Sequence, residues 1–324
     1  MAACLIVACV SAETLSPYIE VWKQWKSDNE KIYNTRAEEA SRFKTFVESA
    51  KTVQVHNLRY SMGLETYTMG LNQFADMTNE EYKASMLTPI EVVEDESRVN
   101  DDLQTSTEGL PSSVDWVNDG VVTHVKNQGQ CGSCWSFAGT GALEGQYALK
   151  YKNLLSFSEQ QQVDCNTYCY GCNGGWAAQA FHYWEKTASN LESAYPYQAH
   201  QYSCRTQGKQ GYAKVSTYYK TKSKSESALQ TAVANVGPIA IAIDASHESF
   251  QRYSGGIYYE SACSQTSLDH AVLAVGYGSN SQGEYWLVKN SWGTSWGDNG
   301  YIYMSRNRNN NCGVSTDCTY PVVA

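Results

Sequence analysis

The densest group of reactive side chains lies in the run Gln128-Gly-Gln-Cys131-Gly-Ser-Cys134-Trp135. A Cys-x-x-Cys pair can act as a redox dithiol, supply half of a zinc site, or place a structural cysteine beside a catalytic one. A zinc site needs a second pair of ligands, and Cys169 and Cys172 have the spacing for it. A redox dithiol needs a short βαβ unit around it, which the flanking sequence does not suggest. The motif by itself leaves these interpretations open.

The distribution of cysteine bears on that choice. Of the 11 cysteines in the sequence, none falls in residues 10–130 and nine fall in residues 131–318. A cysteine-rich globular segment indicates disulfides and an oxidising compartment. An odd number leaves one thiol unpaired, and such a thiol is an inert buried residue, part of an intermolecular bridge, or a nucleophile.

Residues 131–135 read Cys-Gly-Ser-Cys-Trp, which matches in full the local signature of papain-type proteases. His270 lies 136 residues after Cys134 in Leu-Asp-His-Ala-Val, and Asn290 lies 156 residues after it in Lys-Asn-Ser-Trp-Gly. On these motifs the chain resembles the papain family of cysteine proteases, in its cathepsin L-like branch. The resemblance implies an enzyme, a cysteine endopeptidase that hydrolyses peptide bonds through an acyl-enzyme on the Cys134 thiolate.

The resemblance assigns each motif residue a role that its chemistry can fill. A thiol with an ordinary pKa of about 8.5 must be ionised by its surroundings, and Cys134 at the start of a helix would have its thiolate stabilised. His270 would be the imidazolium partner and proton donor to the leaving amine, and Asn290 would orient its ring. Gln128 would donate its side-chain amide to the oxyanion, and Trp292 would shield the His–Asn contact.

Two patterns upstream extend the resemblance over nearly the whole chain. The family motif Glu-x3-Arg-x3-Phe-x2-Asn-x3-Ile-x3-Asn corresponds here to Glu38, Arg42, Phe46, Ser49, Val53 and Asn57, with Ser replacing Asn and Val replacing Ile. The motif Gly-x-Asn-x-Phe-x-Asp is met in full by Gly70, Asn72, Phe74 and Asp76. In the family such a prodomain packs on the enzyme and lays its tail through the cleft. We therefore expect an inactive zymogen inhibited by its own propeptide.

The resemblance also implies how the cysteines pair. The expected bridges, which leave Cys134 free, are Cys131–Cys172, Cys165–Cys204 and Cys263–Cys312. Cys169 and Cys318 remain, and a fourth bridge between them is the simplest hypothesis, although connectivity cannot be deduced from sequence.

Substrate selection in the family depends mainly on the side chain two residues before the scissile bond (P2). Its pocket maps onto walls at Trp176, Ala177, Ala242 and Leu268 and a floor at Asp317, with Gly174 and Gly175 binding the substrate backbone. Small walls make a roomy pocket, and an acid at its floor can pair with a cation. We expect a hydrophobic or aromatic P2 residue, and also Arg when Asp317 is ionised. The short spacing from Cys165 to Cys204 leaves no room for a dipeptidase-type loop, which favours an endopeptidase.

Hydrophobic periodicity predicts the elements that must hold these residues. A helical region with two successive runs is expected over residues 17–57, helices are expected over residues 134–150 and 174–186, and strands over residues 239–243, 271–277 and 285–288. A helical part followed by a sheet part is an α+β arrangement. With the resemblance, the expected fold is a papain-like one: a helical left lobe and an antiparallel β right lobe, preceded by a helical inhibitory prodomain.

With the resemblance, the sequence divides into three parts. Residues 1–12 resemble a signal peptide, residues 13–109 would be the inhibitory propeptide, and residues 110–324 the peptidase domain. The propeptide ends in an acidic segment, residues 91–108, which we interpret as a solvated linker. The net charge of −9 argues against nucleic-acid binding, and no apolar stretch is long enough for a membrane span.

The resemblance sets the remaining expectations. We expect a monomer without a metal or cofactor. Its expected partners are protein or peptide substrates, its own propeptide and cystatin-type inhibitors. The secretory pathway would deliver the chain to a lysosome, a digestive vacuole or the extracellular space. Two alternatives remain: a catalytically silent homologue that acts as an inhibitor or binding protein, and a thiol–disulfide oxidoreductase. A silent homologue should lack one of the four catalytic residues, and all four are present.

Overall fold

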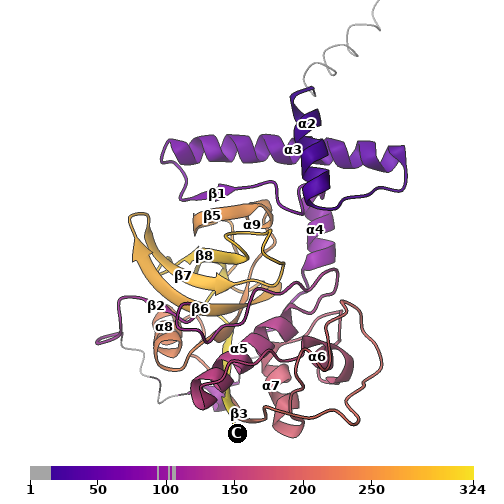
Figure 1. The fold of residues 1–324 in the computed structure, drawn as a ribbon. Helices are drawn as coiled ribbons and strands as arrows, with labels where there is room; N and C mark the ends of the chain where they lie inside the picture. The colour runs from indigo at the N-terminus through magenta and orange to yellow at the C-terminus, as the bar shows by residue number, and fades with distance from the viewer. Residues whose placement is uncertain (1–15, 93–94, 101–102, 104–106) are drawn as a thin grey trace, which may run out of the picture.

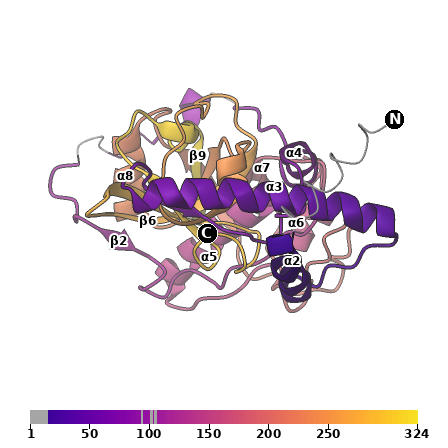
Figure 2. The same cartoon turned by 90° about the horizontal axis from the view of Figure 1, so that it is seen from above.

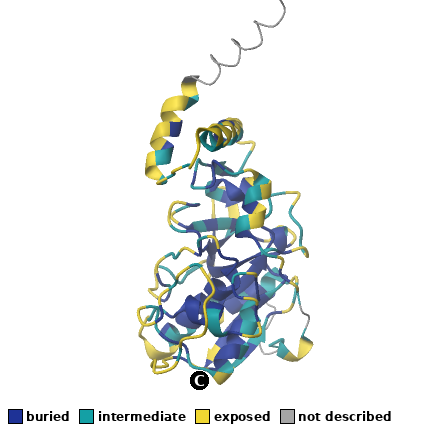
Figure 3. Cartoon of the chain, turned by 90° about the vertical axis from the view of Figure 1, so that its right-hand side faces the viewer, coloured by how far each residue is buried: buried dark blue, intermediate teal, exposed yellow. Residues whose placement is uncertain are grey.

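The structure, a computed structural model, describes residues 16–92, 95–100, 103 and 107–324 (Figure 1). The predicted signal peptide lies outside the described residues. Within them, no helix combines the length and the apolar character needed to cross a membrane. Figure 3 shows that buried residues concentrate in the larger body of the molecule, whereas the two N-terminal helices are mostly exposed.

The N-terminal part is helical, as predicted, and the two helical runs expected within residues 17–57 are separate helices. Its elements are α2 (Ser16–Asp28), α3 (Arg36–Ser61), β1 (Tyr67–Met69), α4 (Asn79–Met86) and the 3-10 turn η1 (Glu96–Arg98). The break has a local cause, because Glu30 adopts a positive φ of 52° and Thr35 caps α3 by accepting a hydrogen bond from Glu38 N. Seen from above, α3 lies across the whole body (Figure 2).

The C-terminal part contains the remaining elements. Its helices are α5 (Cys134–Tyr151), α6 (Glu159–Cys165), α7 (Ala177–Lys186), α8 (Glu226–Asn235), α9 (Glu248–Gln251) and the 3-10 turn η2 (Asn311–Gly313). Its strands are β2 (Val114–Asp115), β3 (Val215–Lys220), β4 (Ile239–Ile243), β5 (Tyr253–Tyr258), β6 (His270–Asn280), β7 (Gly283–Lys289), β8 (Tyr301–Ser305) and β9 (Cys318–Val323). The three predicted strands correspond to β4, β6 and β7, and two of the predicted helices to α5 and α7. Helix α7 begins three residues later than expected, after Gly174 with its φ of +115°.

The strands form one sheet in the order β1-β5-β8-β7-β6-β4-β9-β3, with β2 paired to β6. Every pair is antiparallel except β5 and β8, which run parallel, so the expected antiparallel sheet is mixed at that pair. Strand β1 belongs to the N-terminal part and covers the β5 edge. At the other edge, Val99 makes an isolated parallel bridge to Lys220 of β3. The segment before residue 110 therefore covers both edges of the sheet.

Helix α5 packs between α7 and the sheet, and small residues make that position attainable. A Cβ at Gly141 would lie 2.8 Å from Leu273 of β6, and one at Gly145 would lie 2.7 Å from Pro238. The absence of a side chain at these positions lets the helix approach the sheet closely. The first residue of α5 is thereby held against the start of β6.

Candidate active site

The structure places Cys134 as the first residue of α5, directly after the N-cap Ser133. The Cys131–Cys172 disulfide and a hydrogen bond from Gly132 N to Cys172 O (2.8 Å) hold the segment before it. The thiol is buried, and the backbone amide of Ala271 in β6 opposes the resulting rise in its pKa. Because His270 precedes Ala271, the chain brings the two motif residues together from α5 and β6.

The His270 ring is held on one side and unbonded on the other. Its Nε2 lies 2.8 Å from Asn290 Oδ1, and since a carbonyl oxygen accepts, Nε2 donates in this contact. The Trp292 ring stacks on the imidazole with centroids 4.6 Å apart and planes at 26°. Nδ1 has no hydrogen-bond partner among the described residues. The ring therefore presents a free nitrogen for proton transfer while the other nitrogen fixes its orientation.

Burial determines the charge state of this pair in the proform. It raises the pKa of the Cys134 thiol, against the opposing hydrogen bonds from Ala271, Thr88 and Trp135. It also lowers the pKa of His270 to about 4, against the opposing hydrogen bond with Asn290. At pH values above about 4 the proform consequently favours a protonated thiol beside a neutral imidazole, and not the ion pair expected of an active protease.

Gln128 lies fully buried beside the same segment. Its Nε2 donates to Cys131 O at 3.0 Å, and its Oε1 accepts from Ser291 Oγ at 2.7 Å. A primary amide has two N–H groups, so the second remains for an oxyanion. The two contacts fix the orientation of the amide before any substrate arrives.

A segment of the N-terminal part runs directly past the thiol. Thr88 Oγ1 lies 4.0 Å from Cys134 Sγ, and Thr88 N donates to Asp269 O at 3.0 Å. The chain passes between two glycines, because a Cβ would lie 2.6 Å from Thr88 at Gly132 and 3.3 Å from it at Gly174. Sequence reasoning missed Thr88, which belongs to no motif quoted above, and assigned no role to Gly132, although Gly132 lies inside the Cys-Gly-Ser-Cys-Trp signature.

The next residues cover the predicted P2 pocket. Ile90 N donates to Leu268 O at 2.8 Å, and Trp176 Nε1 donates to Glu91 O at 2.7 Å. Ile90 is buried in one cluster with Leu268 and Ala242, and the partly buried Trp176 and Ala177 pack against it. The structure therefore places the four predicted wall residues in or against one cluster that also contains the propeptide residue Ile90. Gly175 lies behind them, where a Cβ would lie 2.6 Å from Cys169 Sγ.

Asp317, the predicted floor, carries a partner that the sequence did not reveal. Its Oδ1 lies 2.8 Å from Lys220 Nζ, with both side chains only 12% exposed. The pair lines a cavity of about 180 Å³ together with Trp176, Tyr218 and Glu91. No motif contains Lys220, which reaches Asp317 from β3. Because Lys220 compensates the carboxylate, a basic P2 side chain would have to compete with it.

The N-terminal part contacts the catalytic region through aromatic side chains. Phe74 and Tyr82 meet the Trp292 ring edge-on, with centroids 5.4 and 5.7 Å away. The Tyr82 hydroxyl donates to Ala245 O at 2.8 Å, and Asn72 Nδ2 donates to Gln251 O at 2.8 Å. Two members of the Gly-x-Asn-x-Phe-x-Asp motif are thus docking residues for the region around His270.

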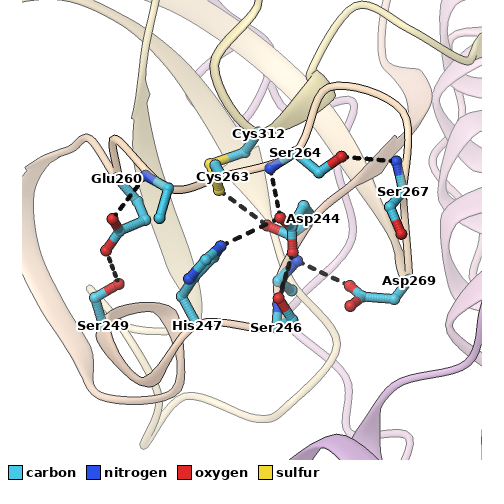
Figure 4. A network of polar contacts seen from close by, with 12 residues as sticks. Asp244, Ser246, His247, Ser249, Glu260, Cys263, Ser264, Ser267, Asp269 and Cys312 are labelled. Carbon is cyan, nitrogen blue, oxygen red and sulfur yellow. Dashed lines mark hydrogen bonds and ion pairs between the residues drawn. A yellow bond between two sulfur atoms is a disulfide. The ribbon is translucent and has the colours of Figure 1, made fainter.

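The loop that receives Tyr82 is held by a polar network around Asp244 (Figure 4). Asp244 Oδ2 accepts from Ser264 N at 2.7 Å and contacts His247 Nε2 at 3.2 Å, while Oδ1 accepts from Ser246. Burial opposes ionisation, but these hydrogen bonds outweigh it and hold the pKa of Asp244 at about 2. Asp244, His247 and Cys263 lie close enough together to resemble a metal site. The Cys263 sulfur is bound to Cys312, however, and cannot serve as a thiolate ligand.

Behind the active site lies a buried charge cluster of Lys126, Glu144, Glu159 and Lys289. Lys126 Nζ lies 2.9 Å from Glu144 Oε1 and 2.6 Å from Glu159 Oε1, and Lys289 Nζ donates to Thr123 Oγ1 at 3.1 Å. A cavity lined by these four side chains also borders Asn290, which directly follows Lys289. The cluster therefore supports the strand end that carries Asn290.

The structure contains the three bridges that the resemblance implies, Cys131–Cys172, Cys165–Cys204 and Cys263–Cys312. The hypothesis of a fourth bridge is wrong, because Cys169 and Cys318 are both free and buried. Cys169 packs with the α5–α7 core, and its sulfur lies 3.8 Å from Trp176 O. Cys318 lies on β9 in the other core, 3.4 Å from Val314 O. The two thiols belong to different clusters, so neither is within bonding reach of the other.

The Arg42–Glu81 contact gives a testable pH dependence. Arg42 Nη1 lies 2.6 Å from Glu81 Oε2, and Glu81 also forms a capping box with Thr78 at the start of α4. Burial opposes ionisation, but the contacts with Arg42 and Thr78 outweigh it and lower the pKa of Glu81 below 4.5. A lowered folded pKa means that this stabilisation is present above about pH 4.5 and is lost as the pH falls through the folded value.

We expect Glu81→Gln to convert to the processed form about two- to fivefold faster than wild type at pH 6, with a smaller difference at pH 3.5. The rate can be followed by gel electrophoresis of the full chain with added active enzyme. Glu80→Gln, an exposed neighbour in the same helix turn, is the matched control. Equal acceleration by both variants would contradict a specific role for Glu81.

Two family models match the chain. Residues 110–322 match the model for papain family cysteine proteases, and residues 22–82 match that for the cathepsin propeptide inhibitor domain. The chain is 47% identical over 314 residues to digestive cysteine proteinase 1 of Homarus americanus, which covers 93% of this chain and 94% of the relative. It is 43% identical over 321 residues to the cathepsin L-like proteinase of Fasciola hepatica, covering 98% of each.

Solved structures agree with these matches. Digestive procathepsin L 3 from the larval midgut of Tenebrio molitor superposes with a TM-score of 0.85 at 41% sequence identity, covering 94% of this chain and 98% of that one. The precursor of recombinant stem bromelain superposes with a TM-score of 0.84 at 36% identity, covering 94% and 98% of the two chains. Both likenesses include the N-terminal part as well as the part that carries Cys134.

Proposed function

We propose that Cys134, His270 and Asn290 carry out the peptide-bond hydrolysis in this chain. The chain belongs to the papain family and is a cathepsin L-type cysteine protease with its propeptide. One observation carries the assignment. His270 is oriented by Asn290 through Nε2 and presents an unbonded Nδ1, while the backbone amide of the next residue along β6 acts to lower the pKa of the Cys134 thiol. No other described cysteine stands beside a histidine that an amide holds in this way.

The reaction follows from this arrangement in two halves. Proton transfer from Cys134 to His270 Nδ1 forms the thiolate–imidazolium pair, and the thiolate attacks the scissile carbonyl carbon. The oxyanion is stabilised by the Gln128 amide and the backbone N–H at the start of α5. His270 then protonates the leaving amine as the C–N bond breaks, which leaves a thioester on Cys134. Water, deprotonated by His270, attacks the thioester and releases the acid with regeneration of the thiol.

Removal of the propeptide activates the site through solvation. Burial holds the thiol and the imidazole uncharged in the proform. Thr88 and Ile90 contribute to that burial, since they pass the thiol and cover the P2 pocket. When they leave, water reaches the pair and the charged forms become accessible. The propeptide therefore inhibits both by blocking the cleft and by disfavouring the ionised nucleophile.

The assignment of domains follows the same logic. Residues 13–109 would be the inhibitory propeptide, and residues 110–324 the peptidase domain. Protein and peptide substrates, the own propeptide and cystatin-type inhibitors would be the partners of a monomeric enzyme. The disulfides and the names of the digestive and cathepsin relatives support delivery through the secretory pathway, to a lysosome or digestive vacuole or to the outside of the cell.

Activity and P2 preference can be tested together. The acid-processed chain should hydrolyse Z-Phe-Arg-AMC under reducing conditions and should act much more slowly on Z-Arg-Arg-AMC, because Lys220 compensates Asp317. Lys220→Met should raise the relative kcat/KM for Z-Arg-Arg-AMC about tenfold, and the added change Asp317→Asn should cancel that gain.

Lys222→Met is the matched control, because this exposed lysine lies two residues farther along the chain. Unchanged selectivity in Lys220→Met would exclude Asp317 as the floor of the pocket. Absence of any hydrolysis by the processed wild-type chain would contradict the proposed activity itself.

A further inference from the structure

The acidic segment between the cleft and residue 110 is not simply a solvated linker, as its composition suggested. Residues 95–100 dock on the outer edge of β3, where Val99 forms a parallel bridge with Lys220 and Asn100 N donates to Lys220 O at 3.1 Å. Asp95 accepts hydrogen bonds from Ser97 N and Oγ and so shapes the η1 turn. This docking places one side chain of the segment, Arg98, against the peptidase domain.

Arg98 makes three kinds of contact there. Its guanidinium lies over the Tyr218 ring, 4.3 Å from the centroid. Nη1 donates to Thr217 Oγ1 at 3.0 Å and lies 3.7 Å from Glu185 Oε1. Stacking, a neutral acceptor and a carboxylate together suit a planar guanidinium, whereas an ammonium is a point charge that cannot stack while donating sideways.

The receiving residues are held in place by the peptidase domain itself. Tyr218 is 9% exposed and packs against Phe181 of α7, with ring centroids 6.2 Å apart. The second carboxylate oxygen of Glu185 lies 2.9 Å from His182 Nδ1, one helical turn earlier. These contacts do not involve Arg98, so the site is preorganised and would persist after the propeptide has left.

We propose that Thr217, Tyr218 and Glu185 form a second peptide-binding site outside the catalytic cleft, which recognises an arginine side chain on an extended peptide. In the proform Arg98 fills this site. In the processed enzyme it is open to an arginine of a bound protein or peptide. The site adjoins the cleft, because β3 ends at Lys220, which pairs with Asp317. The propeptide connects the two sites with the residues between Glu91 and Arg98, and a peptide in the cleft would need a similar length.

The test uses a fluorescein-labelled peptide with the sequence of residues 95–100, Asp-Glu-Ser-Arg-Val-Asn. It is titrated by anisotropy against processed enzyme whose active-site thiol has been alkylated, so that catalysis plays no part. A second peptide carries citrulline, which keeps the shape of arginine but not its charge. We expect the citrulline peptide to bind about tenfold more weakly, from the combined loss of the stacked cation and the ion pair.

Variants of the enzyme locate the binding. Glu185→Gln should weaken binding of the arginine peptide severalfold. Asp119→Asn, which makes the same charge change at an exposed position elsewhere, should leave this binding unchanged. The unprocessed wild-type chain should bind at least about tenfold more weakly than the processed enzyme, because Arg98 already occupies the site. Equal binding of the two peptides, undiminished binding to Glu185→Gln, or no binding up to about 1 mM would each overturn the proposal. Loss of catalysis alone would bear on the proposed function and not on this site.

Discussion

Alanine in place of Cys134 is expected to lower kcat/KM for Z-Phe-Arg-AMC by at least about 10,000-fold, because no other group can form the acyl-enzyme. The variant cannot process itself, so tagged wild-type enzyme must remove its propeptide and then be withdrawn. Cys169→Ala is the matched control, since it removes the other buried thiol of the same lobe and should retain most of the activity.

His270→Ala should produce a loss of similar size, and the double variant should be hardly worse than either single one. Residues that act as one unit show such non-additivity, whereas independent contributions would multiply. Retention of more than about one hundredth of the wild-type activity in Cys134→Ala would contradict the assignment of the nucleophile. A double variant whose loss is the product of both would contradict the joint action of Cys134 and His270.

Breaking the buried charge cluster should have the largest effect on stability. Lys126 is 10% exposed and its partners Glu144 and Glu159 only 1%. Burial disfavours the ammonium, but the two carboxylates outweigh it and raise the pKa of Lys126. Lys126→Met leaves two buried carboxylates without their main partner. We expect it to lower the free energy of unfolding by about 3–5 kcal/mol.

Denaturant unfolding of the full chain at pH 7 measures this as a lower midpoint at an unchanged m-value. Lys23→Met, which breaks the exposed contact with Glu20, should change the stability by less than about 1 kcal/mol. Adding Glu144→Gln to Lys126→Met should recover part of the loss, because fewer buried charges then remain uncompensated. A loss below about 1 kcal/mol in Lys126→Met would show that water or the neighbouring Lys289 compensates the carboxylates.

The sequence predicted those parts of the molecule whose signals are local or belong to a motif. The papain-like fold with its propeptide is confirmed by the solved relatives. Helix α5 begins at Cys134, as expected of a helix that opens with a nucleophile, and the alternating run of β4 was identified to the residue. The grouping of Trp176, Ala242 and Leu268 came from resemblance, because nothing in their spacing shows that α7, β4 and β6 converge.

The features that sequence reasoning missed depend on contacts between distant segments. Lys220 and Asp317 are separated by 97 residues and meet only because β3 and β9 pair. Arg98 is the only basic residue of the acidic segment 91–108, and no local signal indicates that it would stack on Tyr218, 120 residues away. The parity of the cysteine count suggested a fourth bridge, yet Cys169 and Cys318 lie in separate cores, where a reduced thiol is simply a small apolar side chain.

The covering of both sheet edges by one propeptide has a consequence for how inhibition ends. The propeptide holds the enzyme at β1, at Thr88 in the cleft and at Val99 beside β3, three contacts joined by one chain. Each contact benefits from the high effective concentration that its neighbours provide, so the whole inhibitor binds with an avidity that no single contact has. One cut between Ile90 and Arg98 separates the contact beside β3 from the other two, so that each fragment loses the support of the other. The first cleavage would thus weaken the inhibition without removing any contact in the cleft, and a second cut between Tyr82 and Thr88 would separate the cleft segment from the docked helices.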